Sequence, residues 1–200
     1  MFVSVPEKPD QRPLAPAKQR ILETADVLFT REGIRAVGVD WLIEESHVTK
    51  ATFYKHFRAK DRLVLDYLAD RHRRIGLDVA LRLSSITDAA EALVAMRDWT
   101  ANDVGNPALR GCAFLSAAVE YPESDHPVRV SVGIHRRWLH DVFESLLAQL
   151  GHPAPRDGAE DLMLARDGAL LGGYAGDPAD ARAALHRTFQ CVMTSAAVPA

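Results

Sequence analysis

A stretch of sixteen residues, Val48–Leu63, restricts the structure and partners of this chain more than any other part of the sequence. It has the pattern of a short helix with two aromatic side chains, Phe53 and Phe57, that we expect to pack inward as anchors. Residues 47–62 hold five Lys and Arg against one acid, Asp61, in a chain of net charge −3. Because Lys and Arg contacts to phosphate supply most of the salt-dependent affinity for DNA, the stretch predicts a surface that meets nucleic acid.

The distribution of charge along the chain favours the same partner. Residues 1–75 hold 14 basic and 11 acidic residues, whereas the remainder of the chain holds 10 and 16. A basic N-terminal third on an acidic remainder suggests that the first part binds nucleic acid, although ordinary variation in surface charge explains the numbers equally well when they are taken alone. The hydrophobic content of 48% is enough for a core in one domain or in two small ones.

The composition argues against several other classes of protein. The two cysteines, Cys112 and Cys191, are far apart in apolar contexts, which indicates neither a disulfide framework nor a zinc site and favours a reduced, cytoplasmic protein. No apolar run approaches the ~20 residues of a membrane span. Residues 1–16 hold four of the eleven prolines and lack the apolar core of a signal peptide, so they are predicted to be a disordered tail.

The spacing of apolar residues predicts an all-α fold of about nine helices, with no convincing strand and no internal repeat. A first helix carries Ile21, Ala25, Leu28 and Phe29 on one face and ends at Gly33. The other predicted helices cover about residues 39–46, 50–55, 60 to beyond 74, 88–104, 110–121, 127–150, 159–175 and 178–196. The helix over 110–121 is apolar nearly all round, so it is predicted to lie in the middle of the body.

The two short helices over 39–46 and 50–55, preceded by a stabilising helix, have the pattern of a helix-turn-helix. In this motif the second helix enters the major groove of DNA with its N-terminal residues at base edges. Thr49 is predicted to cap that helix, while Lys50 and Thr52 face outward from its first turn toward bases. The residues that we expect to contact phosphate, from the far end of the helix and the start of the next one, are Tyr54, Lys55, His56 and Lys60.

Residues 21–65 resemble the DNA-binding domain of the TetR family of bacterial transcriptional regulators. The matching pieces are Ile21–Ala25 with Leu28-Phe29, Glu32-Gly33, Val48–Phe57 and Lys60–Leu63. The resemblance covers about a quarter of the chain. It implies a helix-turn-helix domain over 17–66 and a helical ligand-binding and dimerisation domain over 67–200.

Several positions depart from the pattern of the family. Gly38 stands near the DNA at the start of the second helix, where the family usually has a capping Thr or Ser. Ile43 replaces a small Ala, and Ala59 replaces the Ser that usually precedes Lys60. His47 replaces the Gly of the turn and therefore has to tolerate a left-handed or strained backbone. These departures put individual contacts in doubt and leave the fold unaffected.

The resemblance further implies an effector pocket and a dimer through the last two helices. The pocket residues that we expect, from the three central helices, are Met96, Trp99, Phe114, Tyr121 and Trp138, although they serve equally well as core. If they line the pocket, the effector is apolar or aromatic. The candidates for the dimer seam are Leu162, Leu170, Leu185, Phe189 and Val192. Gly168, Gly172 and Gly173 permit close helix packing, either within the chain or across the dimer.

These features predict a homodimeric regulator, most simply a repressor that a small molecule releases from a roughly palindromic operator on double-stranded DNA. Nothing in the sequence predicts a cofactor, a metal site or catalysis, and Glu120, His135 and His140 are expected in solvated or pocket-edge positions. Two alternatives remain open. One is a helical ligand-binding protein or enzyme with a vestigial DNA-binding head. The other is redox or electrophile sensing by Cys112, which needs a nearby cation, and only Arg110 is close in sequence.

Overall fold

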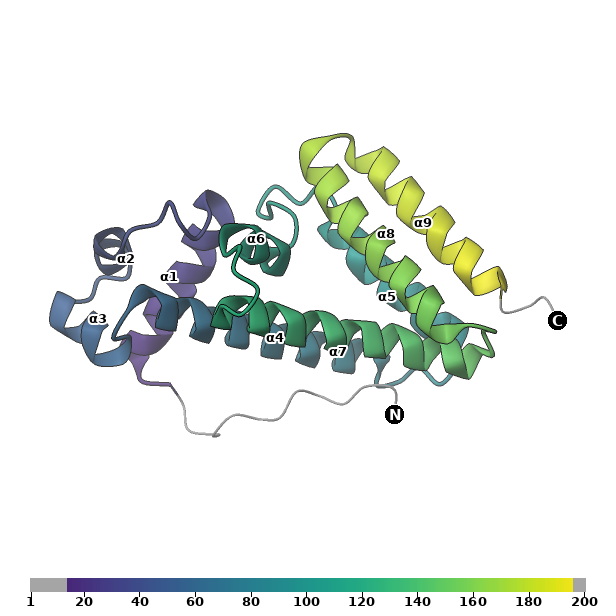
Figure 1. Ribbon diagram of the computed structural model, residues 1–200, viewed down its shortest axis with the longest axis horizontal. Coiled ribbons are helices and arrows are strands. Elements are labelled where there is room, and N and C mark those ends of the chain that lie inside the picture. The colour runs from purple at the N-terminus through teal and green to yellow at the C-terminus, as the bar shows by residue number, and fades with distance from the viewer. Residues whose placement is uncertain (1–13, 196–200) are drawn as a thin grey trace. The chain divides into compact units, whose positions relative to one another are not determined.

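The computed structural model describes residues 14–195, and within that range it contains nine α-helices and no strand (Figure 1). The predicted all-α fold is therefore confirmed. The predicted tail lies, as far as residue 13, outside the described residues. In the described part of the chain no helix is both long and apolar enough to cross a membrane. The helices are α1 (Pro16–Glu32), α2 (Val39–Glu45), α3 (Lys50–His56), α4 (Lys60–Leu83), α5 (Ala89–Asp103), α6 (Ala113–Glu120), α7 (Pro127–Leu150), α8 (Pro155–Ala175) and α9 (Pro178–Ser195).

The described residues form two compact units, each with its own core. The head unit contains the described residues up to Arg74 together with Ala113–Gly133. The body unit contains Ile75–Cys112 and the described residues from Ile134 onward. Helices α4 and α7 therefore contribute to both units, and the whole of α6 belongs to the head unit. The predicted division of the chain at residues 66 and 67 stays a prediction.

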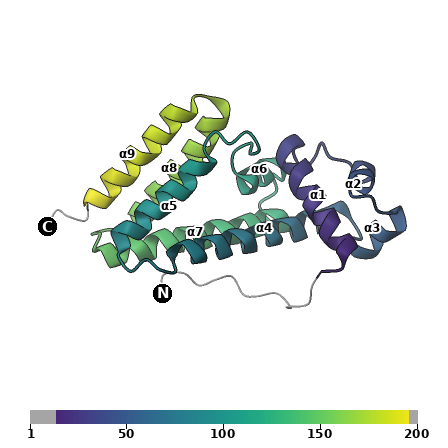
Figure 2. The same ribbon diagram turned by 180° about the vertical axis from the view of Figure 1, so that it is seen from behind.

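The core of the head unit comes from α1, α2, α3 and the first part of α4 (Figure 2). Phe53 and Phe57 are completely buried there, with ring centroids 5.9 Å apart, so both aromatic anchors point inward as predicted. Full burial of one such side chain contributes about 1.5–3 kcal/mol. The other large side chains buried with them include Ile21, Leu28, Phe29, Leu42, Leu63, Val64 and Leu68. This core fixes the orientation of the short helix α3.

The body unit is built around α5, α8 and α9, with the second parts of α4 and α7. Helices α8 and α9 lie side by side in both views (Figures 1 and 2). All five residues that we considered for a dimer seam are buried in the core of a single chain. A Cβ on Gly173 would lie only 2.5 Å from Cγ1 of Val104, so this glycine allows α8 to approach the end of α5.

Three expectations about helices differ from the structure. The helix predicted over 110–121 begins only at Ala113, because Gly111 adopts φ +80° and interrupts the helical path. Nor does α6 lie in the middle of the body, since it belongs to the head unit and Val119 on it is 82% exposed. Helix α8 begins at Pro155 instead of residue 159, because proline suits the first position of a helix.

Candidate nucleic-acid interface

The start of α3 is held by the predicted N-cap. The backbone N–H of Thr52 donates to Oγ1 of Thr49 at 3.1 Å, and the two hydroxyl oxygens are 2.9 Å apart. An N-cap of this kind contributes about 0.5–2 kcal/mol relative to alanine. It also leaves the other N–H groups of the first turn available to an anion such as a DNA phosphate.

The side chains predicted to touch DNA extend from the outer face of α3 and its surroundings. Lys50, Tyr54 and Lys55 are exposed, whereas Thr52 and His56 are half-buried. The ring of Tyr54 packs edge-on against the buried ring of Phe53, with centroids 5.4 Å apart, and this contact restrains it. Exposed cations on a helix held by buried aromatic rings suit DNA backbone contacts, and the individual contacts remain predictions.

Lys50 forms an ion pair with an acidic residue of α2. Its Nζ lies 3.6 Å from Oδ1 of Asp40 on α2, and both side chains are largely exposed. Ion pairs between exposed side chains contribute little, about 0–1 kcal/mol. Lys50 can therefore leave Asp40 for a base or a phosphate at little cost.

The structure confirms two departures from the family pattern. His47, in the turn between α2 and α3, has φ +51°, a conformation that favours glycine. Gly38 is the N-cap of α2 and supplies no side-chain hydrogen bond. Gly38 is exposed, so its backbone is accessible beside α2.

Glu120, at the C-terminal end of α6, binds the loop between α1 and α2. The backbone N–H of Ile34 donates to Oε1 at 2.9 Å, and that of Arg35 donates to Oε2 at 2.5 Å. Both carboxylate oxygens are thus used in charge-assisted hydrogen bonds, which are stronger than neutral ones. We call this arrangement the Glu120 clamp.

The Glu120 clamp differs from the solvated or pocket-edge position expected for Glu120. One feature of the sequence could have indicated this role. Glu120 is an acid at the C-terminal end of a helix, where the helix dipole disfavours negative charge, so its carboxylate needs hydrogen-bond donors from another part of the chain. The partner is 85–86 residues away in the chain, so no local pattern identifies it.

Tyr121, next to the Glu120 clamp, contacts the start of α4. Its hydroxyl donates to Oδ1 of Asp61 at 3.2 Å, and the guanidinium of Arg35 lies 5.9 Å from its ring centroid. Burial and the negative charge of Asp61 raise the pKa of Tyr121 to about 12, so the hydroxyl stays protonated at neutral pH. The end of α6 therefore contacts elements on both sides of the helix-turn-helix.

Lys60 is half-buried beside the same contacts. Its Nζ donates to the backbone oxygen of Arg35 at 3.5 Å. Burial lowers the pKa of Lys60, although Glu120 and Asp61 act in the opposite direction. The predicted phosphate-binding lysine is thus also a part of the loop that Glu120 holds.

The structure does not bring the five predicted pocket residues into one unit. Met96 and Trp99 are buried in the hydrophobic cluster of the body unit, and Trp138 packs against that cluster. Phe114 and Tyr121 belong to the head unit. The indole N–H of Trp99 donates to Oδ2 of Asp78 at 2.9 Å, as expected for a buried tryptophan that is part of the core.

The body unit has two surface hollows that sequence reasoning missed. A hollow of about 330 Å³ between α7 and α8 combines three basic side chains with an acid and two apolar residues: Arg136, Arg137, His140, Glu160, Met163 and Leu164. A groove of about 430 Å³ between α8 and α9 is lined mainly by small residues, among them Ala165, Gly168, Gly172, Ala181 and Ala184. Neither includes any of the five predicted pocket residues.

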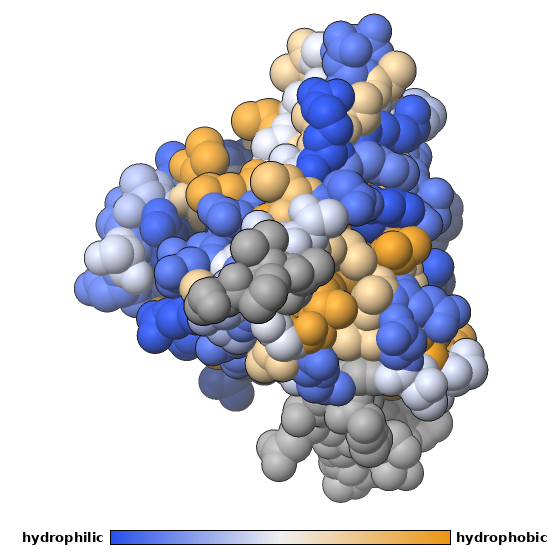
Figure 3. Space-filling view, turned by 90° about the vertical axis from the view of Figure 1, so that its right-hand side faces the viewer, coloured by the Kyte–Doolittle hydropathy of each residue, from blue (hydrophilic) through white to orange (hydrophobic). Residues whose placement is uncertain are grey.

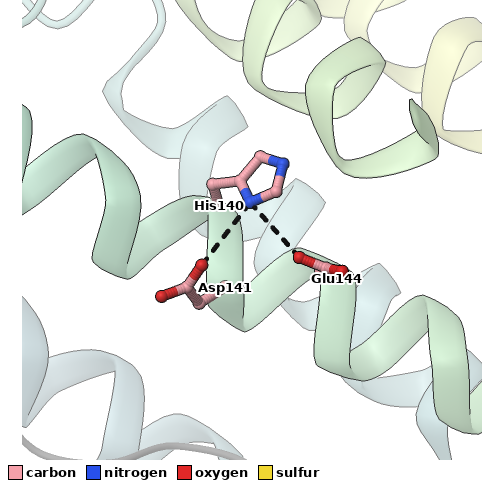
Figure 4. Close-up of side chains that lie close together, drawn as sticks. All are labelled: His140, Asp141 and Glu144. Atoms are coloured by element: carbon pink, nitrogen blue, oxygen red, sulfur yellow. Dashed lines mark ion pairs between the residues drawn. The ribbon is translucent and has the colours of Figure 1, made fainter. Parts of the chain in front are cut away.

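A histidine and two acids gather on α7 beside the first hollow. Nδ1 of His140 lies 3.6 Å from oxygens of both Asp141 and Glu144 (Figure 4). The three side chains come from two neighbouring positions and a third one turn further along α7, and Asp141 is exposed. Contacts of this kind are common between solvated side chains, so we assign no metal to them.

Comparison with known proteins agrees with this geometry. A family model described as bacterial regulatory proteins of the tetR family matches residues 21–67, which span α1, α2, α3 and the beginning of α4. The solved structure of a TetR-family transcriptional regulator from Streptomyces coelicolor is 36% identical, with a TM-score of 0.87, and the match covers 91% of this chain and 96% of that one.

More distant proteins are similar as well. A TetR-family regulator from Agrobacterium tumefaciens is 23% identical over 88% of this chain and 97% of its own, with a TM-score of 0.80, and shows the fold alone. An uncharacterized HTH-type transcriptional regulator of Mycobacterium tuberculosis is 29% identical over 94 residues. That match spans 46% of each of the two chains, about half the length of this curated relative.

Proposed function

This chain belongs to the TetR family of transcriptional regulators, and on that basis we propose that it acts as a homodimeric repressor. In this proposal two copies of α3 read the half-sites of a roughly palindromic operator, since the two-fold symmetry of a dimer is mirrored in its DNA. A small-molecule effector binds the body unit and lowers the affinity for DNA. The protein acts in the bacterial cytoplasm, where its operator is.

The observation that carries the proposal is the outer surface of α3. Thr49 caps the helix, the buried Phe53 orients it, and the exposed Lys50 and Tyr54 extend from it. A helix start of this kind presents N–H groups and a lysine side chain to DNA at the same time.

Dimerisation through α8 and α9 is supported by the character of their exposed surface. Leu164 and Leu171 are exposed, and they lie seven residues apart on the same face of α8. Small residues line the groove between the two helices, which would allow helices of a second copy to approach closely. Apolar side chains form patches among hydrophilic ones on the face drawn in Figure 3. Exposed apolar patches of this kind often mark interfaces.

Effector release requires that the effector bind two conformations with different affinity. We place the connection at the Glu120 clamp, because the last residue of α6 holds the loop that leads into α2. A displacement of α6 would weaken these hydrogen bonds and change the position of α2 and α3. The Arg-lined hollow between α7 and α8 is a candidate effector site.

The test is a selection of the purified protein against random duplex DNA at moderate salt. Enrichment of an inverted repeat is the expected result. If only weak, salt-sensitive binding is found, with no enriched sequence and with turnover of a small molecule, the alternative of an enzyme with a vestigial head replaces the proposal. The altered caps at Gly38 and Ala59 and the bulky Ile43 are what favour that alternative.

A further inference from the structure

The half-buried Cys112 lies immediately before α6 and faces a buried arginine. Its Sγ is 3.7 Å from Nη2 and 3.8 Å from Nη1 of Arg166 on α8. The positive φ of Gly111 turns the chain just before this cysteine. The cation that a reactive cysteine needs is thus supplied from 54 residues away in the sequence.

Arg166 has less negative charge around it than a buried guanidinium requires. Its side chain is only 7% exposed, and its buried Nε has no hydrogen-bond partner. Nη1 donates to Oδ1 of Asp167 at 2.8 Å, but Asp167 also accepts from Arg136 at 2.5 Å. One carboxylate therefore serves two guanidinium groups, and negative charge on the sulfur of Cys112 would balance the cluster.

Arg110, the arginine close to Cys112 in sequence, contacts Tyr174. Arg110 stacks on the ring of Tyr174, at 5.6 Å, and donates from Nε to its hydroxyl at 2.8 Å. Burial acts to lower the pKa of Arg166, but the charges of Cys112 and Asp167 outweigh it and raise that pKa overall. Arg166 therefore stays protonated against the sulfur.

We propose that Cys112 is a site of covalent modification by small apolar electrophiles, namely α,β-unsaturated carbonyl compounds. The thiol proton of Cys112 passes to water, the sulfur forms a C–S bond to the β-carbon, the electrons of the C=C bond move to the α-carbon, and the α-carbon takes a proton from water. No group leaves and nothing is oxidised. The apolar class follows from the position of Cys112, which packs against the hydrophobic cluster of the body unit.

Modification at this position has a route to the DNA-binding head. A thioether carries the added bulk of the electrophile on Sγ, so it disturbs the contact between Sγ and Arg166 and displaces Cys112, which directly precedes α6. The other end of the same short helix is Glu120, which holds the loop between α1 and α2. This consequence for DNA binding rests on the proposed function, whereas the reactivity of Cys112 does not.

The first experiment compares the two cysteines within the same full-length, unmodified protein. The protein is treated with a limiting amount of N-ethylmaleimide at pH 7, and the labelling of Cys112 and Cys191 is followed by peptide mass spectrometry. Cys191 is the more exposed of the two, so simple access predicts that it reacts first. We expect Cys112 to react at least about tenfold faster, because the Arg166 guanidinium beside its Sγ stabilises negative charge on the attacking sulfur. Equal rates, or faster labelling of Cys191, would overturn the proposal.

Two variants then test the role of Arg166. Arg166→Lys keeps the positive charge and is expected to keep the preference for Cys112, whereas Arg166→Met is expected to abolish it. Circular dichroism establishes that each variant is folded. An undiminished preference in a folded Arg166→Met protein would contradict the assignment of Arg166. A separate experiment treats the protein with hydrogen peroxide and traps any sulfenic acid at Cys112 with dimedone. If Cys112 forms sulfenic acid but shows no preferential labelling by maleimide, the proposal that it reacts with carbon electrophiles is overturned.

The last arm measures binding to the selected operator before and after maleimide treatment. Treated wild-type protein is expected to lose affinity, and treated Cys112→Ser protein to retain it. Selective labelling with unchanged operator binding would refute the route through α6. Failure of the untreated protein to bind any operator would contradict the proposed function, while the labelling experiment would still decide the reactivity of Cys112.

Discussion

In the turn between α2 and α3, one side chain occupies a backbone conformation that glycine adopts more readily. His47 has φ +51°, and left-handed backbone costs a residue with a Cβ roughly 1–2 kcal/mol. The sequence predicted this strain, since His47 stands where the family has glycine. The turn is nevertheless fixed by other contacts, including the Ser46 hydroxyl, which donates to the backbone oxygen of Leu42 at 2.5 Å.

Replacement of His47 by glycine should stabilise the protein. The relief of strain exceeds the added entropy of the unfolded chain, and we expect an increase of about 0.5–1 kcal/mol in the free energy of unfolding. Chemical denaturation measures it. His47→Ala is the control, because it removes the imidazole but keeps the Cβ, and an equal gain in that variant would show that strain is not the cause.

Single residues also show what the sequence can and cannot predict. The cap from Thr49 was predictable because its acceptor and donor lie three residues apart on one helix turn. The partners of Glu120 and Cys112 were not, because each lies more than fifty residues away and no periodic pattern connects them. Local chemistry identifies candidates, and only the fold pairs them.

Two of the glycines in α8 have opposite surroundings. A Cβ on Gly173 would lie 2.5 Å from Val104, whereas a Cβ on Gly168 would meet nothing within 4 Å. The sequence left open whether these glycines served the core or a dimer, since both uses favour the same residue type. The structure assigns Gly173 to contacts within the chain.

The two glycines should respond in opposite directions to alanine. Gly173→Ala is expected to lower the free energy of unfolding by about 1–3 kcal/mol, because the added methyl group overpacks the contact with the end of α5. Gly168→Ala is the matched control, and it should gain roughly 0.5–1 kcal/mol from helix propensity. Thermal or chemical unfolding distinguishes the two, and similar values for both variants would rule out the close approach.

Helix α6 shows why its predicted place was wrong. Its uniform apolarity favoured burial on all sides, but a helix of eight residues that buries only Phe114 and Ala117 leaves Val119 in solvent. The C-terminal end of α6 is held by the hydrogen bonds that Glu120 accepts. A pattern of hydropathy does not predict polar contacts of this kind.

Replacement of Glu120 by glutamine tests this element. The amide keeps the volume of the side chain but presents a donor where the carboxylate accepts, so one backbone N–H of the loop loses its acceptor. We expect a loss of about 1–3 kcal/mol in the free energy of unfolding, measured by denaturation. Glu123→Gln, at an exposed acid three residues on, should change little. Equal effects of the two substitutions would argue against the Glu120 clamp.

For the whole molecule, helix spacing predicted the all-α fold, because apolar periodicity is a property of the sequence itself. The dimer was predicted only through the resemblance, and the residues first considered for its seam are buried in a single chain. The exposed leucines of α8 are the better candidates, since burial within one chain leaves no surface for another.

Replacement of these two leucines by charged residues should separate the protomers. Leu164→Glu with Leu171→Glu is expected to give a monomer in sedimentation equilibrium at micromolar concentration, because two carboxylates would have to be buried at the interface. Leu77→Glu with Leu81→Glu on α4 introduces the same two charges at exposed positions and should leave a dimer. A dimeric double variant would mean that the interface lies elsewhere.

The most direct test of sequence-specific DNA binding through α3 is a parallel selection on random duplex DNA with the wild-type protein and with Lys50→Ala. We predict that the wild-type protein enriches an inverted repeat, and that the variant loses or broadens the preference at one position in each half-site, because Lys50 lies at the start of α3 where side chains reach base edges. An identical motif enriched by both proteins, or no motif from the wild-type protein, would contradict the assignment of α3 as the element that reads DNA.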